Sequence, residues 1–225
     1  MIHPDMATML VFITTDAAVT QAMLQAAVSA DVVNTFNMIS VDGDTSTNDM
    51  LSVMANGLAG NPLIDAPGPD FDAFAAALHE VAASLSKAIA RDGEGATKLL
   101  SCIVTGAASD HDARLAAKAV IASSLVKAAM FGSDANWGRV LCALGYSGAV
   151  FDPEKTDVAF SSSAGIVEVC RNGRALPFSE EKAKTVLLEN EVTILVGMKD
   201  GSAGATAWGC DLSYDYVRIN GDYRS

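Results

Sequence analysis

Apolar residues recur along this chain at two spacings, one typical of buried strands and the other of amphipathic helices. Residues 9–13 and 99–105 are short runs rich in branched side chains, and they predict buried strands. Shorter runs predict further strands at 39–41, 192–196 and 205–208. The clearest helix begins at residue 70 and ends near Gly93, because apolar side chains recur there at helical spacing, at Phe71, Phe74, Leu78, Val81, Leu85 and Ile89.

Polar and turn-forming residues mark where the elements of the first half begin and end. Residues 14–16 offer N-cap side chains for a helix that runs to about Ala30. The polar stretch 42–49 leads to a predicted helix that ends at the Asn-Gly pair 56–57. Residues 60–69 are rich in Gly and Pro and form the clearest connection in the chain.

The second half continues the mixture of helices and strands. Residues 110–130 return to helical spacing and predict one helix, and Asn136 opens a shorter one. The sequence Arg-Asn-Gly-Arg at 171–174 predicts a type I′ hairpin between strand-like residues. Ser179 can cap a further helix through about Glu189.

Helices and strands interleave along the whole sequence, so the predicted fold class is mixed α/β. With 225 residues, of which 50% are hydrophobic, the chain can bury a substantial core. We expect one compact domain over residues 1–225, or one with a small lobe. A strand-rich C-terminal lobe is expected at about 150–225, ending in a short capped turn and a polar tail at 218–225.

Charge and cysteine content narrow the class of protein. The chain has 27 acidic and 15 basic residues and a net charge of −12, which argues against a nucleic-acid partner. Its four cysteines lie far apart, as expected of ordinary buried thiols in a reduced, cytoplasmic protein. The first residues lack a basic stretch, and no apolar run approaches the ~20 residues that span a bilayer. We therefore expect neither an export signal nor a membrane anchor.

The first seventeen residues carry the most informative motif. By itself, Thr8 before a buried strand would be a cap or surface residue, because a threonine needs a nearby base to act as a nucleophile. However, Met-Ile-His-Pro-Asp-Met-Ala-Thr-Met-Leu at 1–10 and Phe-Ile-Thr-Thr-Asp-Ala at 12–17 resemble the self-cleavage segment of the ornithine acetyltransferase family. Further family-like blocks follow in family order at 42–49, 91–98, 136–139, 208–211 and 219–223, so the resemblance covers nearly the whole chain.

The resemblance implies that the precursor cuts itself between Ala7 and Thr8. This sequence then corresponds to the C-terminal, or beta, chain, preceded by a residual pre-cleavage segment at 1–7. Thr8 becomes the catalytic nucleophile, with its new α-amino group, of pKa about 7.7–8.0, as the base beside its hydroxyl. It takes the acetyl group from N-acetylornithine and passes it to glutamate in arginine biosynthesis, with acetyl-CoA as a further donor that the resemblance leaves open. The implied fold is shared with DmpA-like enzymes.

The resemblance also assigns substrate binding to Thr8, Glu94, Asn220 and Ser225. An amino-acid substrate carries an ammonium and a carboxylate, which an acidic side chain and neutral hydrogen-bonding groups can complement. Without the resemblance, Glu94 would be interpreted as a solvated loop carboxylate, and Asn220 and Ser225 as part of an ordinary frayed terminus. The family further implies an N-terminal (alpha) chain as partner, in a heterotetramer or a larger assembly.

Neither a metal nor a cofactor is expected. Residues 42–49 have the alternating oxygen ligands of a calcium loop, but its sixth position lacks glycine and Val53 stands where the bidentate glutamate belongs. The Gly-Glu-Gly at 93–95 is too short for a dinucleotide fingerprint. The three histidines form no triad that the sequence reveals.

Two family features would precede Met1 and have no counterpart in this sequence: an oxyanion-stabilising Thr-Gly pair and a substrate-binding lysine. Because oxyanion donors contribute ~10²–10³ in rate, we expect the chain alone to be a poor enzyme. Met1–Ala7 would also block Thr8 until they are removed. Two alternatives stay open: an N-terminal-nucleophile aminopeptidase or amidohydrolase, which would not need glutamate, and a non-catalytic half of a heteromer.

Overall fold

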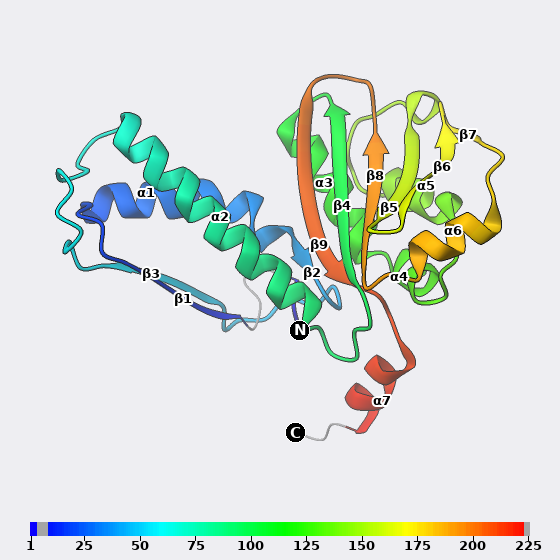
Figure 1. Cartoon of the computed structure of the whole chain (residues 1–225), viewed down its shortest axis with the longest axis horizontal. Coiled ribbons are helices and arrows are strands. Elements are labelled where there is room, and N and C mark those ends of the chain that lie inside the picture. Colours follow the sequence, from blue (N-terminus) through cyan, green and yellow to red (C-terminus); the bar gives the residue numbers. More distant parts are fainter. Residues whose placement is uncertain (4–8, 223–225) are drawn as a thin grey trace. The chain divides into compact units, whose positions relative to one another are not determined.

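The computed structural model describes residues 1–3 and 9–222 (Figure 1). Its contacts divide the chain into two units. Unit 1 comprises Met1–Asn37 with Asp42–Ser86, and unit 2 comprises Met38–Val41 with Lys87–Ser225. Both contain helices and strands, so the predicted mixed α/β class is confirmed.

Unit 1 is built on two parallel strands, β1 (Leu10–Thr15) and β3 (Met50–Ala55), paired from Leu10 opposite Met50 to Thr15 opposite Ala55. The first strand alternates between buried and exposed residues, and its buried Val11 and Ile13 face the core. The helices of this unit are α1 (Gln21–Asp31), η1 (Val32–Asn34) and most of α2 (Pro69–Arg91), and η2 (Phe36–Met38) follows η1. His79 of α2 contacts Asp31 of α1 at 2.6 Å, which ties the two helices together.

Two predictions for unit 1 are wrong. Residues 50–55 form strand β3 rather than a helix, because their backbone pairs with β1 along the whole strand. The helix predicted to start at residues 14–16 starts at Gln21, since β1 continues to Thr15 and it is Thr20 that caps α1. The Thr20 hydroxyl accepts a hydrogen bond from Met23 N at 3.4 Å.

Unit 2 contains a seven-stranded sheet in the order β2-β9-β4-β8-β5-β6-β7. Pairs β2-β9 and β4-β8 are parallel and the other neighbours are antiparallel. The type I′ hairpin is confirmed, since Asn172 and Gly173 both have positive φ, 50° and 69°. The strands are β2 (Ile39–Ser40), β4 (Leu99–Ala107), β5 (Asp157–Ser162), β6 (Gly165–Arg171), β7 (Arg174–Ala175), β8 (Glu191–Gly197) and β9 (Ala203–Cys210).

Helices of unit 2 cover one face of this sheet (Figure 1). α3 packs on β4 and β9, and α6 packs on β5 and β6. A Cβ atom at Gly209 would lie 2.3 Å from Cγ2 of Ile121 and 2.6 Å from the carbonyl oxygen of Ser40, so only glycine lets α3 approach this closely. The remaining elements are α3 (Asp110–Ala122), α4 (Ser124–Phe131), α5 (Trp137–Gly145), η3 (Pro153–Lys155), α6 (Glu180–Leu187) and α7 (Tyr214–Asp222).

Three further predictions need correction in unit 2. The single helix predicted at 110–130 is two, because extended backbone at Ser123 ends α3 and the Ser123 hydroxyl caps α4. The predicted short capped turn and the polar tail as far as Asp222 form one helix instead, α7 (Tyr214–Asp222). Three of the four cysteines are buried as predicted, but Cys142 is exposed. The strands beyond residue 150 share one sheet with β2 and β4.

Among the described residues, no helix combines the length and the apolar character needed to cross a membrane.

Lys98, at the start of β4, is buried and joins two helix ends. Its Nζ donates to the carbonyl oxygens of Met130 (2.7 Å) and Leu187 (2.6 Å) and to Oγ of Ser133 (2.9 Å). Burial lowers the pKa of Lys98, and the charge of Asp211 opposes this effect. Because one ammonium donates to a carbonyl near the end of each helix, it fixes both α4 and α6 to the sheet.

We expect Lys98→Met to lower the free energy of unfolding by about 1–3 kcal/mol, because the end of each helix loses a hydrogen bond from a charged donor. Urea denaturation of the variant and the parent chain measures this. Lys182→Met, which removes an exposed ammonium from α6, is the control and should change stability little. Equal unfolding midpoints for both variants would show that Lys98 does not hold the helix ends.

Candidate functional site

Two residues with predicted substrate roles meet in unit 2. Nδ2 of Asn220 donates a hydrogen bond to Oε2 of Glu94 at 2.7 Å, across 126 positions of sequence. Glu94 lies in the loop between α2 and β4, and Asn220 lies on α7. Both side chains are exposed, so a ligand can reach them. We call this pair the Glu94–Asn220 site.

The buried carboxylate of Asp211 fixes the loop that carries Glu94. Its Oδ1 accepts hydrogen bonds from the backbone nitrogens of Thr97 (2.8 Å) and Lys98 (2.9 Å). Its Oδ2 accepts from the hydroxyl of Thr97 at 2.5 Å. Asp211 follows the last residue of β9, so the loop is attached directly to the end of that strand.

Contacts at its first turn hold helix α7 against the same loop. Oγ of Ser213 donates to the carbonyl oxygen of Gly95 at 2.5 Å and accepts from the backbone nitrogen of Tyr216 at 3.4 Å. The ring of Tyr214 meets that of Phe131 edge-to-face, with centroids 5.5 Å apart. Gly95 has a φ of +68°, and a Cβ there would lie 2.5 Å from Tyr216 N. The loop and the helix are therefore in direct backbone contact.

Hydrogen-bond capacity limits what the Glu94–Asn220 site can bind. Nδ2 of Asn220 donates both to Glu94 and to the carbonyl oxygen of Tyr216, at 3.0 Å. Both hydrogens of this amide are thus used, and the side chain keeps its Oδ1 as an acceptor. Glu94 adds a carboxylate oxygen, Oε1. Two acceptor oxygens, one of them charged, suit an ammonium group better than a carboxylate.

The polar loop 42–49 contacts the backbone on either side of the predicted cleavage site. Oδ1 of Asp42 accepts from Ile2 N at 2.8 Å, and Oδ1 of Asp49 accepts from Met9 N at 2.8 Å. Burial alone would raise the pKa of Asp42, but hydrogen bonds from the Met1 ammonium and from backbone nitrogens outweigh it and lower the pKa. Burial raises the pKa of Asp49, and the bond from Met9 opposes the rise only in part.

The structure therefore unites Glu94 with Asn220, whereas the predicted residues Ala7, Thr8 and Ser225 lie outside the described residues. Sequence reasoning missed the roles of Asp49 and Asp211. Both stand in blocks that resemble the family, but no local pattern predicts a backbone partner so far away in the sequence.

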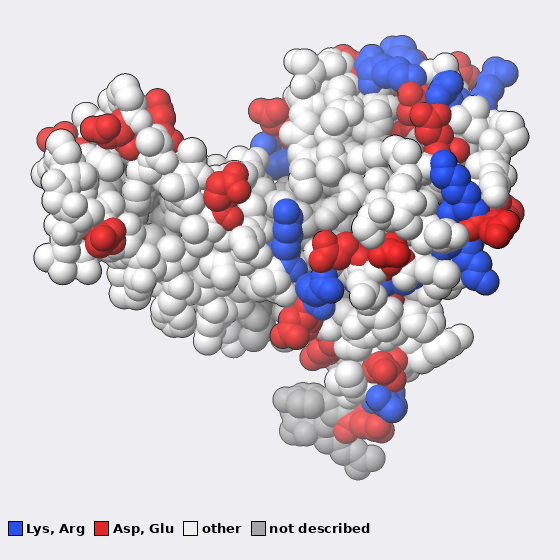
Figure 2. Space-filling model, viewed as in Figure 1, with Lys and Arg blue, Asp and Glu red and all other residues white. Residues whose placement is uncertain are grey.

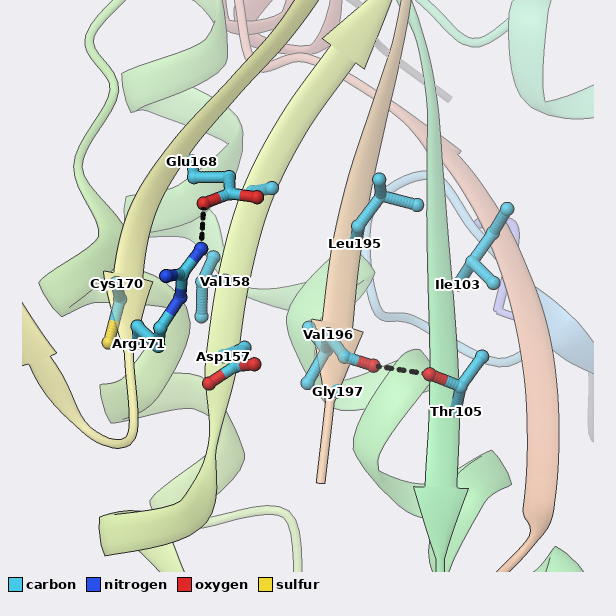
Figure 3. Close-up of a pocket in the computed structure, with 11 residues that line it drawn as sticks. Ile103, Thr105, Asp157, Val158, Glu168, Cys170, Arg171, Leu195, Val196 and Gly197 are labelled. Atoms are coloured by element: carbon cyan, nitrogen blue, oxygen red, sulfur yellow. Dashed lines mark hydrogen bonds and ion pairs between the residues drawn. The ribbon is translucent and has the colours of Figure 1, made fainter. Parts of the chain in front are cut away.

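A cavity of about 250 Å³ lies elsewhere on unit 2, at strands β4, β5, β6 and β8 (Figure 3). Its polar groups are already paired: Arg171 with Glu168, and Asp157 with Lys199 at 2.7 Å. Burial would raise the pKa of Asp157, but the bonds from Lys199 and from the backbone of Asn172 lower it. Neither residue of the Glu94–Asn220 site lines this cavity.

Charged residues are distributed unevenly between the units (Figure 2). Residues 1–86 contain ten acidic residues and no Lys or Arg, so all 15 basic residues stand from Lys87 onward. Among the described residues, no group of three His, Cys, Asp or Glu side chains is arranged to hold a metal ion.

The family model described as the ArgJ family matches residues 1–225. The arginine biosynthesis bifunctional protein ArgJ 1 of Clostridium acetobutylicum is 57% identical over 225 residues, which are 100% of this chain and 55% of that protein. The protein ArgJ of Caldanaerobacter subterraneus is 56% identical over 225 residues, 100% of this chain and 56% of that protein. This chain thus spans about half the length of these curated relatives.

A solved structure is similar as well. The crystal structure of the arginine biosynthesis bifunctional protein argJ from Bacillus halodurans aligns with a TM-score of 0.91 and 49% identity. The alignment covers 96% of this chain and 100% of that chain.

We expect Gly95→Ala to destabilise the chain by more than the about 1–2 kcal/mol that a left-handed conformation costs an ordinary residue. The new Cβ would force the first turn of α7 away from the loop. Denaturant unfolding, with limited proteolysis of α7, measures both effects. Gly148→Ala is the control, since it has a φ of +82° with its nearest neighbour 4.0 Å away. The idea fails if both variants lose the same free energy and α7 stays protected.

Proposed function

This chain belongs to the ArgJ family, and on that premise we propose that it is the nucleophile-bearing part of an N-acetyltransferase of arginine biosynthesis. The enzyme moves the acetyl group of N-acetylornithine to glutamate through an acetylated Thr8. The curated relatives that support this proposal are about twice as long as the chain. The activity therefore needs the segment that these relatives have in addition.

The contact between Glu94 and Asn220 is the observation that carries this proposal. N-acetylornithine has lost the charge of its α-amino group but keeps a side-chain ammonium. The two acceptor oxygens of the Glu94–Asn220 site complement such a group. Glutamate has no second ammonium, so the site distinguishes the donor from the acceptor by charge.

The acyl transfer uses one threonine and its own amine. The α-amino group of Thr8 takes the hydroxyl proton while Oγ forms a bond to the acetyl carbonyl carbon. The C–N bond to ornithine then breaks, and the departing amine takes the proton from the α-ammonium, leaving an acetyl ester. The amine of glutamate attacks this ester, its proton returns to Oγ through the α-amino group, and N-acetylglutamate leaves.

We expect Thr8→Ala to abolish covalent capture of the acetyl group in the enzyme assembled with its upstream half. The variant lacks the hydroxyl oxygen that forms the ester in this proposal. Intact mass before and after incubation with N-acetylornithine measures capture, and Thr14→Ala, an exposed threonine of β1, is the control. An acetylated Thr8→Ala chain would falsify the proposal. Consumption of N-acetylornithine without glutamate would favour the amidohydrolase.

The outer face of β1 and β3 is the proposed contact with that upstream half. Four large apolar side chains lie on it: Leu10 (67% exposed), Phe12 (60%), Met50 (41%) and Met54 (49%). Parallel strands are normally covered on both faces, and an isolated pair of strands is marginally stable at best. About 45% of each longer relative lies outside the matched segment, which is enough chain to cover this face.

The acidic charge of unit 1 also supports the upstream half as its partner. Unit 1 has acidic residues and no Lys or Arg, so a partner with basic residues around an apolar patch is complementary to it.

We expect Phe12→Thr to weaken association with the upstream half by about 2 kcal/mol, or roughly thirtyfold, because Phe12 is a large aromatic at the centre of the face. Threonine keeps the strand propensity, so the fold should survive. Co-expression with the tagged upstream half followed by size-exclusion chromatography measures the complex. Leu58→Thr is the control, since Leu58 is 80% exposed but lies outside both strands. Equal recovery of both complexes would place the interface elsewhere.

A further inference from the structure

Helix α7 carries Asn220, yet its own side chains hold it only lightly. None of its nine residues, all within the described part of the chain, is buried. Tyr214 contacts the ring of Phe131 but stays 83% exposed. A helix this short is marginally stable in water by itself. The position of Asn220 therefore depends on the contacts made at the ends of α7.

Ser213 stands where the chain leaves the sheet and enters α7. The residue before it is fixed, since Leu212 N donates to the carbonyl oxygen of Lys127 at 3.3 Å. Ser213 itself is only 5% exposed, and its side chain contacts both the helix and the loop that carries Glu94. Ser213 thus sets the direction in which α7 begins.

A single hydroxyl makes both of these contacts. Oγ of Ser213 accepts from Tyr216 N, as an N-cap side chain does, and donates its one hydrogen to the carbonyl oxygen of Gly95. Gly95 follows Glu94 directly in the sequence. The first bond starts the helix and the second attaches it to the loop. One side chain therefore couples the helix of Asn220 to the backbone beside Glu94.

The length of α7 amplifies any change in direction at Ser213. Asn220 lies seven residues further along, which is about 10 Å at a helical rise of ~1.5 Å per residue. A turn of about 10° at Ser213 would thus move Asn220 by about 2 Å. The hydrogen bond from Asn220 to Glu94 measures 2.7 Å and would not survive such a shift.

We propose that Ser213 is a positioning residue for the acetyl donor: its hydroxyl directs α7 so that Asn220 meets Glu94 and the two bind the donor's ammonium together. The proposal rests on the donor-binding role proposed above for the Glu94–Asn220 site. Because Ser213 is buried, it acts through Asn220 rather than by contact with the donor.

The position of the ammonium on the donor predicts which kinetic constant changes. The side-chain ammonium of N-acetylornithine is remote from the acetyl group that reacts. Binding of this ammonium is therefore equal before and during acyl transfer, so its loss raises KM and leaves kcat unchanged. Glutamate has no second ammonium and does not use the site. A general loss of stability would instead affect both substrates alike.

The test uses the enzyme assembled with its upstream half, and measures kcat/KM separately for N-acetylornithine and for glutamate. We expect Ser213→Ala to lower kcat/KM for N-acetylornithine roughly tenfold, as for a lost hydrogen bond to a charged group, and to leave that for glutamate unchanged. Ser213→Thr, which keeps the hydroxyl, should retain the parent's values. Ser179→Ala removes the matched N-cap hydroxyl of α6 and should also match the parent.

Combination with Asn220→Ala tests whether Ser213 acts through that side chain. Asn220→Ala alone should cause a similar loss for the donor, and the double variant should lose no more than Asn220→Ala does. Additive losses in the double variant would overturn the proposal. Ser213→Ala with the parent's kcat/KM for the donor, or with equal losses for both substrates, would overturn it as well.

Should Ser213→Ala fail to assemble, Ser213→Gly takes its place, because glycine is tolerated as an N-cap and also lacks the hydroxyl. Parent-like donor kinetics in Ser213→Gly would overturn the proposal equally. Parent-like donor kinetics in Asn220→Ala would refute the proposed role of the site and, with it, the role of Ser213. Acetylation of Thr8→Ala would instead refute the proposed function itself.

Discussion

The buried carboxylate of Asp211 is the interaction on which the Glu94–Asn220 site depends. It accepts three hydrogen bonds from Thr97 and Lys98 and so attaches the Glu94 loop to the end of β9. Helix α7 follows directly after this point, and the site forms where α7 returns across the loop. The Glu94 loop and helix α7 are therefore both attached to the end of β9. This shared attachment positions two exposed side chains, Glu94 and Asn220, for binding.

Elements with strong local signals could be predicted from the sequence, and elements defined by distant pairing could not. Helix α2 has an unbroken apolar period, and the Asn-Gly pair at 172–173 specifies its own turn. The short apolar run of β3 fits a helix as well as a strand, and only its pairing with β1 decides between the two. The substrate role predicted for Asn220 rests on family resemblance, and its contact with Glu94 depends on a tertiary approach that no local pattern encodes.

The two units differ in how completely they bury their strands. Unit 2 covers one face of a seven-stranded sheet with helices and carries almost balanced charge, with all the basic residues of the chain. Unit 1 has only two strands, an apolar outer face and no basic residue. A pair of parallel strands is stable only when both of its faces are covered. Unit 2 therefore resembles a complete domain, whereas unit 1 resembles part of a domain.

The polar loop 42–49 links the two units in sequence and contacts the backbone around the predicted cleavage site. It joins β2 of unit 2 to β3 of unit 1, and its two end carboxylates, Asp42 and Asp49, hold backbone before and after the predicted cleavage site. After the preceding peptide bond is cleaved, a new N-terminal residue keeps a defined position only if the chain that follows it is held in place. Loss of residues 1–7 removes the donor of the bond from Ile2 to Asp42, whereas both partners of the bond from Met9 to Asp49 stay in the chain. The loop thus contacts the backbone on the side of the predicted cleavage site that would retain the proposed nucleophile.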